Sequence, residues 1–254
     1  MKDLFFLLVL ANVLLLNVLN LAAQSMGAAD IVRLTDEKFN GEKSSIMVMS
    51  MTIIRPGWQR TVEFRSWSMG REKALTLLTA PAKDKGQTFL KIDQEMWSWN
   101  PAISRLIKLP PSMMSQGWMG SDYTNDDILK ESSVVMDYTH EIVGEEIIDN
   151  RLCYKIKMVA REDADVVWGK QLRWIDKNEL LILKAQLFDD EGSLVRTENW
   201  SEIKNMDGRV IPSRLELVPA DEPGNKTIVN IREVKFNVGI KDSFFSHQNM
   251  KNIR

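Results

Sequence analysis

The sequence holds little of what catalytic and metal-binding sites are usually made from. It has one cysteine, Cys153, and two histidines, His140 and His247, among 254 residues. A single cysteine cannot form an intramolecular disulfide, so the core alone must hold the fold together. The two histidines lie far apart in the sequence and lack the close spacing of a zinc site. We therefore expect no metal ion and no cofactor.

Catalytic motifs are missing as well. The chain has no H-E-x-x-H, no G-x-S-x-G and no glycine-rich phosphate loop. Cys153 has no neighbouring base and falls on the outward face of its strand, so we expect a surface thiol rather than a nucleophile. These absences favour a protein that is not an enzyme.

One acidic group leaves an alternative open. Asp122, Asp126 and Asp127 could bind a cation or serve as a carboxylate pair in a hydrolase. The same stretch also has the pattern of a helix start. Thr124 and Asp127 have the spacing of a capping box, and acidic side chains are stabilised near a helix N-terminus. The second interpretation is the simpler one.

No charge of one sign dominates the chain. The sequence has 33 basic and 35 acidic residues, and no basic stripe. Sustained nucleic-acid binding depends on clustered Lys and Arg at the phosphates. We therefore expect no nucleic-acid partner.

Long apolar runs are confined to the start of the chain. A Leu- and Val-rich run follows Lys2 and ends in small residues at 22–25, which is the plan of a secretory signal peptide. We predict a signal peptide at 1–23, cleaved after Ala23 or Ser25, with a retained membrane anchor as the alternative. No cysteine ends the run, so no lipidation is expected. The predicted location is the periplasm, with residues 24–254 forming a single domain.

The remaining chain alternates polar and apolar residues with a period of two, interrupted by turn residues. Residues 28–39 are the exception, because their pattern predicts an amphipathic helix. The short connections favour antiparallel hairpins. We predict a mainly β (α+β) fold: a strongly curved antiparallel sheet, or open half-barrel, of about 11 strands. The N-terminal helix and a short central helical insertion would cover the concave face. A closed, lipocalin-like barrel is the alternative.

Two stretches are rich in large, adaptable side chains. Met47, Met49 and Met51 alternate along one strand and so share one face. Residues 97–128 begin with Trp97 and Trp99, also on one face of a strand, and continue into an irregular apolar loop. Both stretches could be core, or could form a pocket wall or lid, since Met fills irregular gaps and adapts to varied ligands.

The second stretch resembles a known family. The pattern W-x-W-x-P, followed by P-S-M and W-M-G-S-D-Y-T-N-D-D, is similar to the outer-membrane lipoprotein-sorting protein family, within the LolA/LolB-like superfamily of periplasmic carriers. The similarity is specific over Trp97 to Asp127 and weaker elsewhere. It implies a helix closing a curved sheet around an apolar cavity. It also implies transfer of lipid, or of lipoprotein acyl chains, towards the outer membrane, with an RND- or ABC-type inner-membrane exporter as partner.

The resemblance also gives the site predictions. The candidates for the apolar cavity and its lid are Met47, Met49, Met51, Trp97, Trp99, Met113, Met114, Trp118 and Met119. Arg105 is the candidate for an arginine that latches the helical lid, although Arg60 and Arg65 are equally available. We expect a monomer. The alternative function is a periplasmic lipid- or protein-sensing regulatory module on the same fold, without catalysis.

Overall fold

The computed structural model describes residues 26–40, 43–113, 116–125, 133–164 and 166–254. The predicted signal peptide at 1–23 lies outside the described residues, as do Met114, Asp126 and Asp127. The capping box and most of the predicted central helical insertion therefore fall outside as well. The described part of that region has two short 3-10 turns, Pro111–Met113 and Trp118–Gly120.

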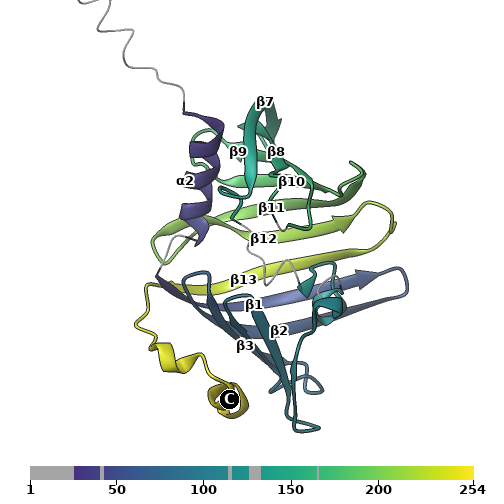
Figure 1. Ribbon diagram of the computed structural model, residues 1–254, viewed down its shortest axis with the longest axis vertical. Coiled ribbons are helices and arrows are strands. Elements are labelled where there is room, and N and C mark those ends of the chain that lie inside the picture. Colours follow the sequence, from purple (N-terminus) through teal and green to yellow (C-terminus); the bar gives the residue numbers. More distant parts are fainter. Residues whose placement is uncertain (1–25, 41–42, 114–115, 126–132, 165) are drawn as a thin grey trace, which may run out of the picture.

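Thirteen strands form one antiparallel sheet within the described residues (Figure 1). They are β1 (Ser44–Arg55), β2 (Trp58–Met69), β3 (Lys73–Ala80), β4 (Thr88–Ile92), β5 (Glu95–Asn100), β6 (Arg105–Lys108), β7 (Tyr138–Ile148), β8 (Arg151–Ala160), β9 (Lys170–Asp176), β10 (Ile182–Phe188), β11 (Leu194–Met206), β12 (Arg209–Pro219) and β13 (Lys226–Phe236). The predicted mainly β, antiparallel fold is confirmed. The count exceeds about 11 because short segments such as β4 and β5 pair as separate strands.

The strand order explains why the sheet stays open. Each strand pairs with its neighbours in the chain, except that β6 and β7 do not pair with each other, and β1 also pairs with β13, which joins the first and last strands in the middle of the sheet. The order runs from β6 at one edge to β7 at the other. Because these edges do not pair with each other, the closed-barrel alternative is wrong.

Helix α2 (Ala28–Asn40) packs on one face of the sheet beside β7 to β9 (Figure 1). Ile31 and Val32 are fully buried against Ile156 and Met158 of β8. The early helix is thus confirmed. Asp36 lies one turn after Val32 and therefore points to the sheet.

The C-terminal segment covers the opposite face of the sheet. Its helix α4 (His247–Asn252) begins at Ser246, whose side chain accepts a hydrogen bond from the backbone N–H of Asn249. Trp97 packs edge-on against His247, with ring centroids 4.7 Å apart, and Met250 is fully buried. This cap and this burial stabilise an ordered helix in the C-terminal segment.

Cys153 also corrects a prediction. It does lie on the face of β8 opposite Ile156, as expected from the alternation. It is nevertheless fully buried, because Trp174 and Leu183 pack against it on that face. The predicted surface thiol is therefore wrong: β8 to β10 are packed on both faces.

Candidate functional site: an apolar cavity with a charged end

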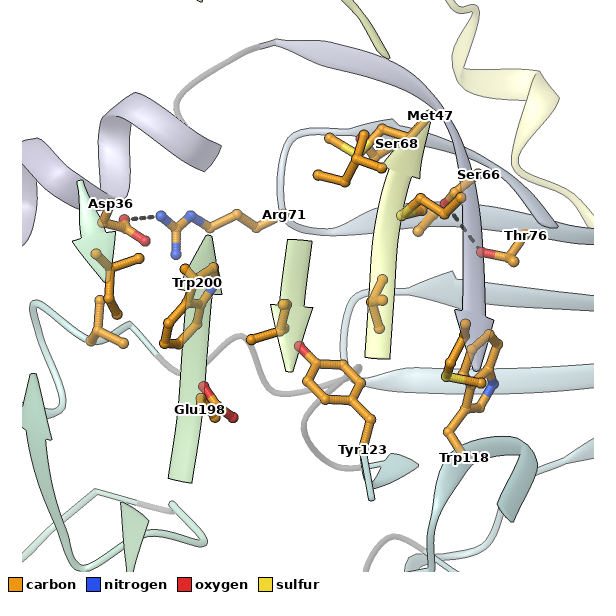
Figure 2. A pocket seen from close by; sticks show the side chains of 18 of the residues that line it. Asp36, Met47, Ser66, Ser68, Arg71, Thr76, Trp118, Tyr123, Glu198 and Trp200 are labelled. Atoms are coloured by element: carbon orange, nitrogen blue, oxygen red, sulfur yellow. Dashed lines mark hydrogen bonds and ion pairs between the residues drawn. The ribbon is translucent and has the colours of Figure 1, made fainter. Parts of the chain in front are cut away.

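The concave face of the sheet encloses a cavity of about 490 Å³. Ligand sites for small molecules commonly measure about 300–1,000 Å³, so the cavity could hold one molecule of that size. Its walls come from β1 to β5, from β9 to β13, from α2, and from the loop that follows β6. Figure 2 shows Met47 and Trp118 on one side of it, and Asp36, Arg71, Trp200 and Glu198 towards the other. The cavity is therefore amphipathic.

The apolar wall is built on strand β1. Met47, Met49 and Met51 all line the cavity, because residues two apart in a strand share one face. Met51 is 1% exposed and belongs to the core cluster beneath, whereas Met47 and Met49 are half-buried. The accessible surface of the latter two thus borders the cavity. These flexible thioethers make a wall that can adapt to an apolar chain.

Trp118 closes the apolar side. Its indole packs edge-on against Phe64 and Phe89, with ring centroids 5.5 and 5.3 Å apart. The indole Nε1 is buried and has no hydrogen-bond partner within the described part of the chain. Met119, which has a positive φ of 57°, packs against the same cluster. The short 3-10 turn at 118–120 therefore places two large side chains over the sheet, and of these two Trp118 lines the cavity.

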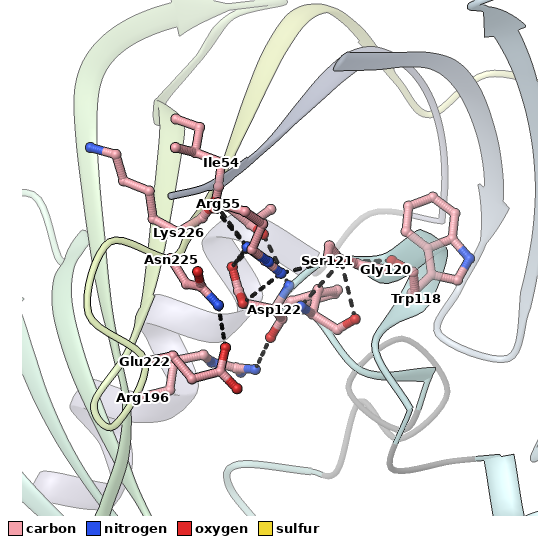
Figure 3. Close-up of polar contacts among 12 residues, drawn as sticks. Ile54, Arg55, Trp118, Gly120, Ser121, Asp122, Arg196, Glu222, Asn225 and Lys226 are labelled. Carbon is pink, nitrogen blue, oxygen red and sulfur yellow. Dashed lines mark hydrogen bonds and ion pairs between the residues drawn. The ribbon is translucent and has the colours of Figure 1, made fainter. Parts of the chain in front are cut away.

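Asp122 anchors this turn to the sheet (Figure 3). Its Oδ1 lies 3.0 Å from Arg55 Nη2, and its Oδ2 accepts a hydrogen bond from Thr227 Oγ1 at 2.6 Å. Its backbone carbonyl accepts a hydrogen bond from Arg196 Nη1 at 2.9 Å. Arg55 also donates to the carbonyl of Gly120 at 3.1 Å. These contacts fix the loop to the sheet through Asp122, and the other two members of the predicted carboxylate group, Asp126 and Asp127, lie outside the described residues.

The other side of the cavity is charged. Arg71, in the turn after β2, forms an ion pair with Asp36 of α2 (Figure 2). On β11, Arg196 Nη2 lies 2.6 Å from Glu198 Oε1, and both side chains are about nine-tenths buried. The first pair joins the helix to the sheet, and the second lies within the sheet.

Arg173 of β9 lies in the same charged region. Its Nε donates to Gln171 Oε1 at 3.0 Å, and within the described residues it has no ion pair. Burial lowers the pKa of its guanidinium below the usual range, opposed first by the charge of Glu198. The side chain still keeps accessible surface, since it lines the cavity.

The other predicted site residues lie elsewhere. Trp97 and Trp99 do not border this cavity; they pack beneath α4 on the opposite face. Met113 contributes a backbone carbonyl that accepts a hydrogen bond from Asn125. Arg105 is exposed at the start of β6, at the sheet edge opposite to β7, the strand beside α2.

The two alternative latch candidates, Arg60 and Arg65, also make their contacts with residues outside α2. Arg60 Nη2 lies 2.6 Å from Asp84, and the guanidinium of Arg65 lies over the Trp67 ring. The contact between an arginine and the helix is made by Arg71 instead.

Asp36, Arg71 and Arg173 are absent from the residues predicted from the sequence. The sequence carried a signal for two of them. Asp36 follows Val32 by one helical turn, and Arg173 lies two residues before Ile175 on the same strand. Each therefore shares a face with a buried apolar residue. Arg71 lies in a turn, where no periodicity indicates its direction.

No group of three or more His, Cys, Asp or Glu side chains could hold a metal ion in the part of the chain that the structure describes. Over that same part, no helix is both long and apolar enough to cross a membrane.

Comparisons with known proteins agree with this architecture. A family model described as "Uncharacterized protein" matches residues 70–252, more than half of the chain, and the chain belongs to that family. Comparison with curated proteins finds no match.

Three solved structures have the same fold. A DUF1329 family protein from Desulfovibrio piger is 24% identical, with a TM-score of 0.80 over 88% of this chain and 97% of its own. A putative outer membrane lipoprotein-sorting protein domain from Vibrio parahaemolyticus is 20% identical, with a TM-score of 0.77 over 88% and 98%. A LolA superfamily protein from Nitrosomonas europaea is 22% identical, with a TM-score of 0.74 over 88% and 99%. The chain thus has the fold of these proteins, which include a LolA superfamily protein and a lipoprotein-sorting domain, and the resemblance seen in the sequence is confirmed at the level of the fold.

Proposed function

We propose that this protein is a periplasmic carrier that binds lipid, or the acyl chains of lipoproteins, in the cavity and transfers them towards the outer membrane. An RND- or ABC-type exporter in the inner membrane would supply the cargo, and the carrier would act as a monomer without catalysis. The cavity itself carries the proposal. Met47 and Met49 leave apolar surface accessible inside the cavity, and a bound acyl chain would cover that surface.

The energetics fit such a role. Burying an acyl chain contributes about 0.8 kcal/mol per CH₂ group, so even one chain would bind without covalent chemistry. Release then requires the cavity to open. The ion pair between Asp36 and Arg71 joins α2 to the sheet beside the cavity, and breaking this partly exposed pair would loosen that side of the helix at modest cost. The buried Ile31 and Val32 would keep the helix attached to β8. Similarity to a lipoprotein-sorting domain and to a LolA superfamily protein supports the same role.

Mass spectrometry of lipid extracted from the gently purified native protein tests the proposal. We expect one defined lipid, or one acylated protein, in stoichiometric amount. The Met49→Lys variant should lose this cargo, because it places a charge in the apolar wall. Thr52→Lys is the matched control, since Thr52 lies on the same strand but faces away from Met51. A protein that arrives empty and also fails to bind a fluorescent fatty acid would overturn the proposal.

One observation favours the alternative of a sensing module. Edge strand β7 exposes Ile142, Val143 and Ile147, with Ile147 67% exposed. An unpaired apolar edge can add a strand from a partner protein. On this alternative, Ile147→Lys would abolish retention of the protein on native inner-membrane vesicles and leave its lipid content unchanged. Unchanged retention would exclude the alternative.

A further inference from the structure

The charges around the cavity are unequal. Six of the lining side chains are cationic and two are acidic: Arg71, Lys73, Lys91, Arg173, Arg196 and Arg214 against Asp36 and Glu198. An apolar chain alone gives no reason for this excess. A low-dielectric site with surplus positive charge favours an anion over a neutral group of the same shape.

Most of these cations already have partners. Arg71 pairs with Asp36 and Arg196 with Glu198, as described above. Lys73 pairs with Asp242, and Arg214 Nη2 lies 3.4 Å from Glu216. Lys91 likewise has an interaction of its own. These groups are therefore partly neutralised where they stand.

Arg173 differs from them. Its one hydrogen bond within the described residues uses Nε and the amide of Gln171, which carries no charge. The two terminal nitrogens are thus left with their N–H donors in a half-buried, cavity-lining position. Glu198 and Asp36 act on Arg173 through space, but each already pairs with another arginine. Holding a buried cation without a hydrogen-bonded counter-charge is costly, and a bound anion would remove that cost.

Arg173 and the methionine wall lie at different places along the concave face. Arg173 lies on β9, beside Ala185 of β10 and Ile156 of β8, whereas the methionine wall lies on β1. Four strands, β10 to β13, separate β9 from β1 in the sheet. A ligand with its head group at Arg173 would therefore extend its chain across the concave face to Met47, Met49 and Trp118, which line the other side.

We propose that the cargo is a lipid with an anionic head group, a carboxylate or a phosphate, and that Arg173 binds this group through its terminal nitrogens. This inference rests on the proposed carrier function and adds the class of cargo. The planar guanidinium presents two parallel N–H donors that fit either oxyanion in a bidentate arrangement. Lys at the same position would supply charge without that fork.

Matched pairs of lipids test the inference. Displacement of a neutral fluorescent acyl probe would be measured with oleic acid against oleyl alcohol, and with lysophosphatidic acid against monoacylglycerol of the same chain. We expect at least one anionic lipid to bind about 10- to 100-fold more tightly than its neutral partner, the range for hydrogen bonds to charged groups. The pair with the larger ratio distinguishes a carboxylate from a phosphate.

Variants locate the effect. Arg173→Gln should remove the anionic preference, measured as the ratio of the two affinities within each lipid pair, and Arg173→Lys should keep part of it. Arg232→Gln is the control, because Arg232 is a half-exposed arginine paired with Glu63 that does not line the cavity. Thermal unfolding would confirm that each variant is folded. Equal binding of charged and neutral lipids by the wild type would overturn this inference while leaving the carrier function intact. Failure of every lipid and of the probe would instead refute the carrier function.

Discussion

Asp36 on α2 and Arg71 in the turn between β2 and β3 form an ion pair that joins the helix to the sheet at the cavity. Their side chains are 13% and 31% exposed, so water screens the contact only in part. On its other side, α2 carries the exposed pair of Arg33 and Glu37. The helix thus has an ion pair that borders the cavity at Asp36, and further pairs away from it at Arg33 and Lys38.

Breaking the first pair should speed cargo release. In Asp36→Asn we expect the dissociation rate of a bound fluorescent fatty acid to rise about fivefold, because a partly exposed ion pair contributes about 1 kcal/mol. Stopped-flow displacement measures this rate. Arg33→Gln should leave the rate unchanged, as its pair only supports the solvent side of the same helix. Equal rates in both variants would show that α2 does not control release.

The Asp122 anchor should matter for stability more than surface pairs do. We expect Asp122→Ala to lower the free energy of unfolding by about 2–4 kcal/mol. The substitution leaves the guanidinium of Arg55 and the hydroxyl of Thr227 without the carboxylate that they contact. Urea denaturation followed by tryptophan fluorescence measures the loss. Lys108→Gln breaks an exposed pair with Glu95 and should cost less than about 1 kcal/mol. A loss in Asp122→Ala no greater than this would contradict the anchoring role.

The arrangement of the strands could be predicted because β-hairpins are local. Turn residues and period-two alternation fix strand positions, and short connections make neighbouring strands antiparallel. The pairing of β1 with β13 could not be predicted in this way, since residues such as Met51 and Val229 lie far apart in the chain. It depends on the curvature of the whole sheet.

The site was only partly predictable for a related reason. Alternation indicates which residues share a face, but it does not identify the concave one. The methionines of β1 do line the cavity, whereas Trp97 and Trp99, with an equally regular spacing, pack under α4. Trp174 and Arg173 are adjacent on β9 and point to opposite faces of the sheet. Neither side chain is exposed to bulk solvent, because the sheet is covered on both faces there. Which face lines the cavity depends on the segments that pack over each face of the sheet, and the sequence of a single strand does not show this.

The methionine wall should divide into a structural and a binding part. Met51→Ala should lower the free energy of unfolding by about 2–5 kcal/mol, because Met51 is fully buried. Met47→Ala should cost about 1 kcal/mol or less, since Met47 is half-buried and borders the cavity. It should nevertheless weaken binding of a fatty acid, which loses apolar contact. Thermal unfolding and probe titration on both variants check this division; a reversed order of stabilities would contradict it.

Cys153 provides a prediction on reactivity. Burial raises the pKa of its thiol to about 11, with a smaller contribution from the charge of Asp176. At pH 8 about one molecule in a thousand would carry the reactive thiolate. Iodoacetamide should therefore label the native protein very slowly and the urea-unfolded protein fast, as mass spectrometry can measure. Rapid labelling of the native protein would show that the Trp174 side of the sheet opens.

The same thiol should make stability depend on pH. Its pKa in the folded protein, about 11, lies above the ordinary value of 9.0, so the folded state holds the proton more tightly than the unfolded state. The stabilisation is fully present below pH 9 and is lost as the pH rises towards 11, by about 2 kcal/mol in all. Urea denaturation at several pH values between 8 and 11 would measure this decline. Lysines and tyrosines titrate in the same range, so Cys153→Ala is the necessary comparison: its decline should be shallower than that of the wild type. Parallel declines would mean that the buried thiol keeps an ordinary pKa.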